Sequence, residues 1–191
     1  MSFCSAAPSS SDPGSKGEMF MDHSQPSLTH YLYPGALFAD PRPHLVTTVL
    51  GSCVSVCLWD PVRRLGGINH YLLPLWNGEG LATPRYGNIA IDSLVERMLA
   101  LGCTRGSLQA KIFGGAALWE NPHGLIPIGE RNIELARRQL QQLLIPIVGA
   151  DVGGDAGRKI IFNSEAGSVL LRRHRSSQPA ARPLHPAAAA G

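Results

Sequence analysis

Cys53 and His70 are the residues whose types and surroundings best fit covalent chemistry. Cys53 follows Gly51 and Ser52 at a break between two β-rich runs, where the backbone can turn sharply and direct N–H groups at one point. His70 lies in a neighbouring predicted strand, and a histidine partner lowers the pKa of a thiol and favours the nucleophilic thiolate. We therefore expect an acyl-transfer site with Cys53 as nucleophile, His70 as base, and Gly51 and Ser52 in the oxyanion loop.

The same residues also have non-catalytic interpretations. Free cysteine is among the most buried residue types, and a single histidine is more often a hydrogen-bonded structural residue than a base. Cys57 and Cys103 lack the Gly-Ser break between two β-rich runs that precedes Cys53, so we expect both to be buried. A zinc site made of Cys53, Cys57, His70 and Cys103 would lack the paired C-x₂-C spacing of such sites. We expect no metal and no cofactor.

Strands dominate the elements that must position Cys53 and His70. Two helices are predicted from apolar residues at helical spacing, at 89–101 and 130–144. Strands are predicted at 45–50, 54–59, 66–73, 111–113, 145–151, 159–162 and 168–171. This order favours a single-domain α+β layered sandwich with mixed, mostly antiparallel sheets and two main helices. The glycine cluster at 153–158 matches no phosphate-binding motif and is interpreted as a hairpin turn.

Composition indicates one globular domain of ordinary size. The chain has 191 residues, of which 44% are hydrophobic, and a net charge of +3. Residues 1–26 are predicted to be a disordered extension and 174–191 a disordered Pro/Ala-rich tail, which leaves a domain at 27–173. The charge pattern lacks a nucleic-acid-binding footprint. Without an apolar membrane-spanning run or a secretory signal, we expect a cytoplasmic protein without membrane insertion.

Five sequence blocks, in the same order, resemble the CheD family of bacterial chemoreceptor glutamine deamidases. The match extends from Thr47 to Arg172. The blocks are 50–58, 66–74, 111–116, 128–133 and 151–154. The family is known as a three-layered α/β/β sandwich, and we expect this arrangement here.

The resemblance implies specific roles for residues of this chain. The family's catalytic cysteine and histidine fall on Cys53 and His70, and its threonine on Thr47, with Thr48 as the neighbour that is easily confused with it. The implied activity is that of a protein-glutamine glutaminase acting on methyl-accepting chemotaxis receptors, with hydrolysis of glutamate methyl esters as a further activity. A CheC-type phosphatase is the implied partner. One departure is Ile68, where the family more often has methionine.

Two alternative classes of function remain open at this level. Another thiol acyl transfer, such as that of a protease or a transglutaminase, shares the chemistry up to the acyl-enzyme. A non-catalytic regulatory module that binds receptors or a CheC-type phosphatase is the alternative outside enzymes. The intact set of Cys53, His70 and Thr47 favours the enzyme.

Overall fold

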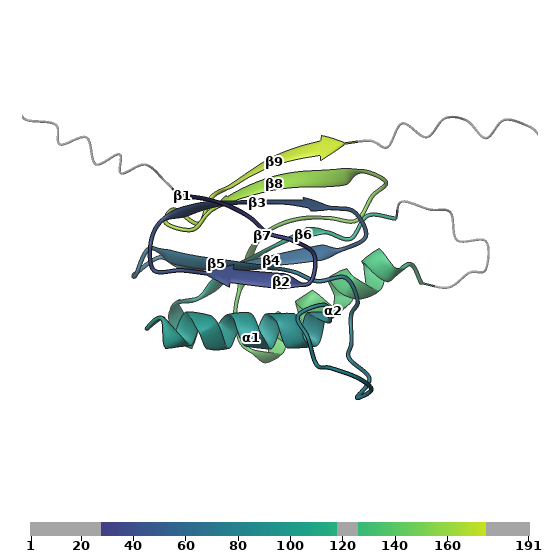
Figure 1. Ribbon diagram of the computed structural model, residues 1–191, viewed down its shortest axis with the longest axis horizontal. Coiled ribbons are helices and arrows are strands. Elements are labelled where there is room, and N and C mark those ends of the chain that lie inside the picture. Colours follow the sequence, from purple (N-terminus) through teal and green to yellow (C-terminus); the bar gives the residue numbers. More distant parts are fainter. Residues whose placement is uncertain (1–27, 118–125, 175–191) are drawn as a thin grey trace, which may run out of the picture.

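The computed structural model describes residues 28–117 and 126–174, which form three layers (Figure 1). The outer sheet has the spatial order β1 (Leu28–Tyr31), β3 (His44–Leu50), β8 (Gly157–Asn163) and β9 (Val169–His174). The middle sheet has the order β2 (Ala36–Ala39), β5 (Leu65–His70), β4 (Val54–Asp60), β6 (Gln109–Gly114) and β7 (Ile147–Val152). Two helices, α1 (Gly87–Ala100) and α2 (Ile128–Gln142), cover the free face of the middle sheet. A short 3₁₀ turn, Arg105–Ser107, precedes β6.

This architecture confirms the predicted α+β sandwich with an α/β/β layer order. Among the described strands, only the β1–β3 and β6–β7 pairs are parallel, and the other pairs are antiparallel. The predicted extension at 1–26 and the tail beyond His174 lie outside the described residues. His174 itself, assigned to the tail from the sequence, is the last residue of β9.

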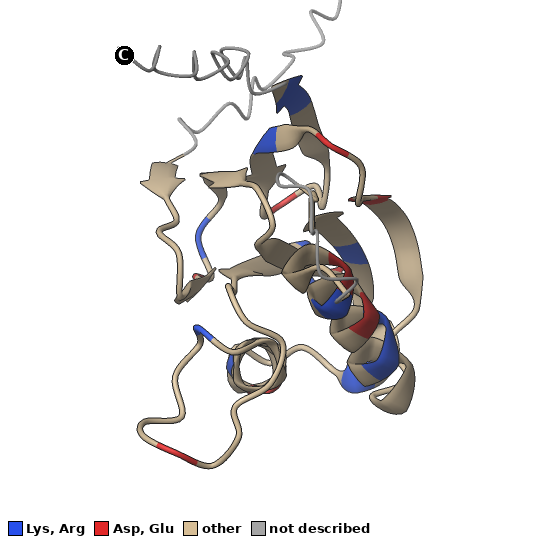
Figure 2. Cartoon of the chain, turned by 90° about the vertical axis from the view of Figure 1, so that its right-hand side faces the viewer, with Lys and Arg blue, Asp and Glu red and all other residues tan. Residues whose placement is uncertain are grey.

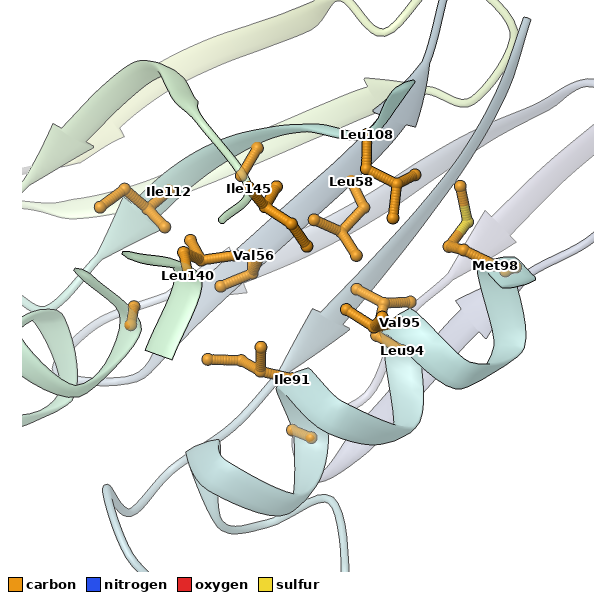
Figure 3. Close-up of a cluster of buried hydrophobic side chains, with 14 of the residues drawn as sticks. Val56, Leu58, Ile91, Leu94, Val95, Met98, Leu108, Ile112, Leu140 and Ile145 are labelled. Atoms are coloured by element: carbon orange, nitrogen blue, oxygen red, sulfur yellow. The ribbon is translucent and has the colours of Figure 1, made fainter. Parts of the chain in front are cut away.

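The helices pack on the middle sheet through side chains that recur at helical spacing. Alternate residues of a strand face opposite sides of its sheet, so Val56 and Leu58 of β4 point towards the helices. They meet Ile91 and Leu94 of α1 and Leu140 of α2, as Figure 3 shows. The predicted apolar face of the first helix is therefore confirmed, although α1 begins slightly earlier, at Gly87.

A second apolar layer lies between the two sheets. We call it the inter-sheet layer; its buried members are Leu32, Val46, Leu50, Cys57, Ile68, Phe113, Ile160 and Phe162. Gly66 on β5 makes room for this layer, because a Cβ atom there would lie 2.6 Å from the Phe162 ring. Since the middle sheet is covered on both faces, all six residues of β5 are buried.

The prediction of a hairpin turn at 153–158 was wrong. In addition, strands β1 and β2 were not predicted from the sequence. The glycine-rich turn leads from β7 in the middle sheet to β8 in the outer sheet, so these strands are not a hairpin. Local sequence shows where a turn occurs but not which partner each strand finds beyond it. Strands β1 and β2 have four residues each, and all residues of β1 are exposed, so β1 has no apolar alternation to reveal it.

Candidate active site

Cys53 lies in a loop that crosses from the outer sheet to the middle sheet. The loop runs from the end of β3 at Leu50 to the start of β4 at Val54. Cys53 is partly exposed, and its side chain packs against the inter-sheet layer. The predicted break at Gly51 and Ser52 therefore places a thiol at the end of that layer, where it can be reached from outside.

Three consecutive carbonyl oxygens of this loop accept hydrogen bonds. The Ala116 N–H donates to Gly51 O (2.8 Å) and the Gly115 N–H donates to Cys53 O (2.8 Å). Between them, Asn132 Nδ2 donates to Ser52 O (3.1 Å). A trans peptide directs its C=O and its N–H in opposite directions, so the N–H groups of Ser52 and Cys53 point away from these partners. These two N–H groups are therefore the candidates for the donors of an oxyanion hole.

Glycine is required next to this loop. Gly114 has a φ of +107°, a conformation that L side chains rarely adopt, and a Cβ atom there would overlap the Cys53 carbonyl. The end of β6 at Gly114 and the next residue, Gly115, therefore pack directly against the backbone of the cysteine loop.

His70 lies beside the cysteine loop at the end of β5. Val54 and Tyr71, the residues that follow Cys53 and His70, form two backbone hydrogen bonds with each other (3.1 and 3.0 Å). The His70 carbonyl accepts from the Gly35 N–H (2.7 Å), which fixes the strand on its other side. Next to His70 the β4–β5 ladder is irregular, because the Asn69 side-chain oxygen replaces a backbone acceptor for the Val56 N–H (2.8 Å).

The hydroxyl that contacts the imidazole belongs to Thr48. Its Oγ1 lies 2.8 Å from His70 Nδ1 and donates to Leu32 O at 2.9 Å. Since the hydroxyl has a single proton, Oγ1 accepts from a protonated Nδ1. This arrangement leaves Nε2 as the unprotonated nitrogen, the atom that can act as a base.

This contact corrects the expectation that Thr47 holds the imidazole. Thr48 is fully buried on the face of β3 that also carries Val46 and Leu50, whereas Thr47 points to the opposite, partly exposed face. Alternation alone does not choose between the two threonines, because the face of Thr47 carries Leu45 and Val49, which are also apolar.

Burial keeps both reacting groups neutral at rest. Desolvation lowers the pKa of His70 to about 4, and His70 is only 1% exposed. Desolvation also raises the pKa of the Cys53 thiol, which its own backbone N–H lowers to a smaller extent. The expected thiolate favoured by its histidine partner is therefore not the resting state, because the burial of both groups disfavours charge.

Unpaired buried polar atoms gather around this site. Among the described residues, three buried side-chain atoms have no hydrogen-bond partner: Asn69 Nδ2, His70 Nε2 and Asn132 Oδ1. Buried polar groups are normally paired, and exceptions often mark functional sites. Sequence reasoning did not single out Asn69 or Asn132; the available signal for Asn132 was a polar residue within the apolar face of a predicted helix.

The remaining sequence expectations concern burial, metals and membranes. Cys57 and Cys103 are buried free thiols, as predicted. In the described part of the chain, no group of three or more His, Cys, Asp or Glu residues is arranged to hold a metal ion. None of the described helices has the length and apolarity needed to cross a membrane. Residues of both charge signs lie along α2 (Figure 2). Arg138 forms an ion pair with Glu134 on this helix.

The site thus combines a partly exposed thiol at a sheet end, backbone N–H groups beside it and an imidazole held by a hydroxyl. Thiol-based acyl transfer requires groups of these kinds. Comparisons with known proteins identify the family: residues 72–173, which begin after Cys53 and His70, match the family model described as CheD chemotactic sensory transduction. A probable chemoreceptor glutamine deamidase CheD of Trichlorobacter lovleyi is 54% identical over 78% of this chain and 92% of its own length. A relative with the same name from Sulfurimonas denitrificans is 49% identical over 74% of this chain and 92% of its own length. Another, from Anaeromyxobacter dehalogenans, is 44% identical over 75% of this chain and 83% of its own length. The chain belongs to the CheD family.

Proposed function

We propose that this protein hydrolyses glutamine side chains of chemoreceptors to glutamate, with release of ammonia, and so regulates chemotaxis adaptation. Family membership supports this activity, because the curated relatives are named as probable chemoreceptor glutamine deamidases. The observation that carries the mechanism is the contact between Thr48 and His70 Nδ1, which leaves Nε2 as a base at the end of the sheet that also holds Cys53.

The first step is attack of the Cys53 sulfur on the amide carbon. Because the thiol is neutral at rest, His70 Nε2 takes its proton as the sulfur–carbon bond forms. The amide oxygen then carries the negative charge, and the N–H groups of Ser52 and Cys53 stabilise it. Each such donor contributes about 3–4 kcal/mol to the transition state in comparable sites.

The second step is the departure of ammonia. The imidazolium donates its proton to the amide nitrogen, the carbon–nitrogen bond breaks, and a thioester on Cys53 remains. Burial lowers the pKa of His70 to about 4, so its imidazolium is a stronger proton donor than an exposed one, which favours this transfer. Water then gives a proton to Nε2 and attacks the thioester carbon; the products are glutamate and the regenerated thiol.

Exposed leucines on the chain segment that follows His70 suit a protein substrate. Leu73, Leu75 and Leu81 lie on the loop that follows β5 and are 38%, 55% and 83% exposed. An apolar surface of this kind fits the apolar face of a receptor helix. We include in the proposal methyl-accepting chemotaxis receptors as substrates, a cytoplasmic location, and a CheC-type phosphatase as a partner.

Ammonia release from a purified chemoreceptor cytoplasmic fragment tests this function. Wild-type protein is expected to release ammonia and to shift receptor peptides by about one dalton, as conversion of Gln to Glu requires, while Cys53→Ala does neither. Receptor cleavage or incorporation of an added amine would instead indicate a protease or a transglutaminase. Receptor binding by both proteins without any ammonia release would contradict the proposal and favour a binding module.

A further inference from the structure

A buried asparagine of α2 connects the two chain segments of the site. Asn132 is 0% exposed, and its Nδ2 donates to Ser52 O (3.1 Å) and to Leu72 O (2.9 Å). Its backbone oxygen accepts from the Tyr71 hydroxyl (2.6 Å). Only an NH₂ group can donate to two carbonyl oxygens, so the orientation of this amide is determined. One side chain therefore ties the segment before Cys53 to the segment after His70.

We propose that Asn132 is a positioning residue that orients the Cys53 N–H as an oxyanion donor. The proposal rests on the acyl-transfer function proposed above. The Ser52 carbonyl and the Cys53 N–H belong to the same trans peptide and point in opposite directions. By holding the carbonyl towards α2, Asn132 directs the N–H towards the thiol side of the loop.

Two observations support a role beyond stability. The Cys53 N–H lies close enough to its own sulfur to lower the thiol pKa, against the larger and opposite effect of burial. The other end of the Asn132 amide, Oδ1, is buried without a partner among the described residues, and such an atom costs free energy. Because the unpaired Oδ1 lowers stability, we infer that the value of Asn132 lies in the two carbonyl groups that its NH₂ group holds.

Gln139 provides a matched control on the same helix. It is also buried, at 9% exposed, and its Nε2 also donates to two oxygens, Asn88 O (3.0 Å) and Asp92 Oδ1 (2.7 Å). Those acceptors belong to α1, so Gln139 joins the two helices and not the active-site segments. Replacement of either Asn132 or Gln139 by leucine removes a buried amide whose NH₂ group donates to two oxygen atoms.

Two chemical probes of Cys53 separate an oxyanion effect from a general effect. Acylation by p-nitrophenyl acetate passes through a tetrahedral oxyanion, whereas alkylation by iodoacetamide displaces iodide and forms no oxyanion. We expect Asn132→Leu to slow acylation about tenfold or more and to change alkylation less than about twofold. Gln139→Leu is expected to change neither rate. Rates measured with Cys53→Ala are subtracted to remove reaction at other cysteines.

Several outcomes would overturn the proposal. An acylation rate of Asn132→Leu equal to that of the wild type would show that the Cys53 N–H donor does not depend on Asn132. An equal loss of the acylation and alkylation rates would show that Asn132 acts on the thiol or on the fold. Asn132→Asp serves if the leucine variant does not fold: its carboxylate cannot donate, and its protonated form restores one donor. Its acylation rate, relative to wild type, must therefore rise as pH falls. Failure of receptor deamidation with the probe ratio intact would contradict the function alone.

Discussion

The inter-sheet layer differs between its middle and its end. In the middle, Cys57 is 1% exposed, packs among apolar residues, and burial raises the pKa of its thiol far above the ordinary value. At the end, Cys53 packs against the same layer but is partly exposed and has free backbone N–H groups beside it. Two thiols of one layer thus have different surroundings, because one lies inside a strand and the other in the loop that precedes it.

Among the described residues, the buried side-chain polar atoms that lack a hydrogen-bond partner also lie near that end. His70 and Thr48 are buried there and satisfy one another through Nδ1, while Nε2 is left unpaired. In the middle of the layer, the buried members of the cluster, such as Ile68 and Phe162, are apolar. Apolar burial in the middle therefore stabilises the folded state, whereas desolvation of unpaired polar groups at the end destabilises it.

Removal of each thiol gives the largest expected difference between the two regions. Cys53→Ala should lower ammonia release by about 10³-fold or more with the unfolding free energy nearly unchanged. Cys57→Ala should keep wild-type activity and lose about 1 kcal/mol of unfolding free energy, because it leaves a small cavity. Activity assays and urea unfolding of both variants check this. A folded, active Cys53→Ala protein would remove the distinction.

The polar end should also make stability depend on pH. The pKa of His70 is about 4 in the folded protein and about 6.5 when the histidine is exposed, so the unfolded state binds more protons between these values. The contribution of His70 to the unfolding free energy is therefore fully present above about pH 6.5, and the unfolding free energy falls by about 3 kcal/mol as pH drops to about 4. Urea unfolding across this range measures the loss. His70→Gln should lack it, and an equal slope in that variant would assign the effect elsewhere.

Substitution of the two threonines tests which face of β3 acts on His70. Thr48→Val removes the acceptor of the Nδ1 proton and should lower kcat about tenfold or more with little change in KM, because the imidazole loses its fixed tautomer. Thr47→Val should stay within about twofold of wild type. Steady-state ammonia assays compare them. A larger defect in Thr47→Val would restore the assignment implied by family resemblance.

The smallest effect is expected outside the layer, on the exposed loop after β5. Leu75→Ser and Leu81→Ser should raise KM for the receptor fragment about fivefold, because each loses apolar contact with the substrate, and should leave kcat unchanged. Val62→Ser is the control, since Val62 is 82% exposed in the turn at the opposite end of β4. If all three variants bind the receptor equally, this loop is not the docking surface.

The sequence alone was informative wherever the deciding interactions are local. Helical spacing of Ile91, Leu94 and Met98 predicted α1, and β-rich runs predicted most strands. The Gly51-Ser52 break predicted where Cys53 would lie, because a strand must end there for the chain to turn. Short strands without alternation, such as β1, gave no such signal.

Only the tertiary structure decided the contacts that join distant segments. Alternation in β3 separates Thr47 from Thr48, but the meeting of Thr48 with His70 depends on how the two sheets pack. Asn132 reaches Ser52 across 80 residues of sequence, a contact that no local pattern specifies. The neutral state of His70 and Cys53 likewise follows from desolvation by the surrounding layers, and residue types chosen one strand at a time cannot show it.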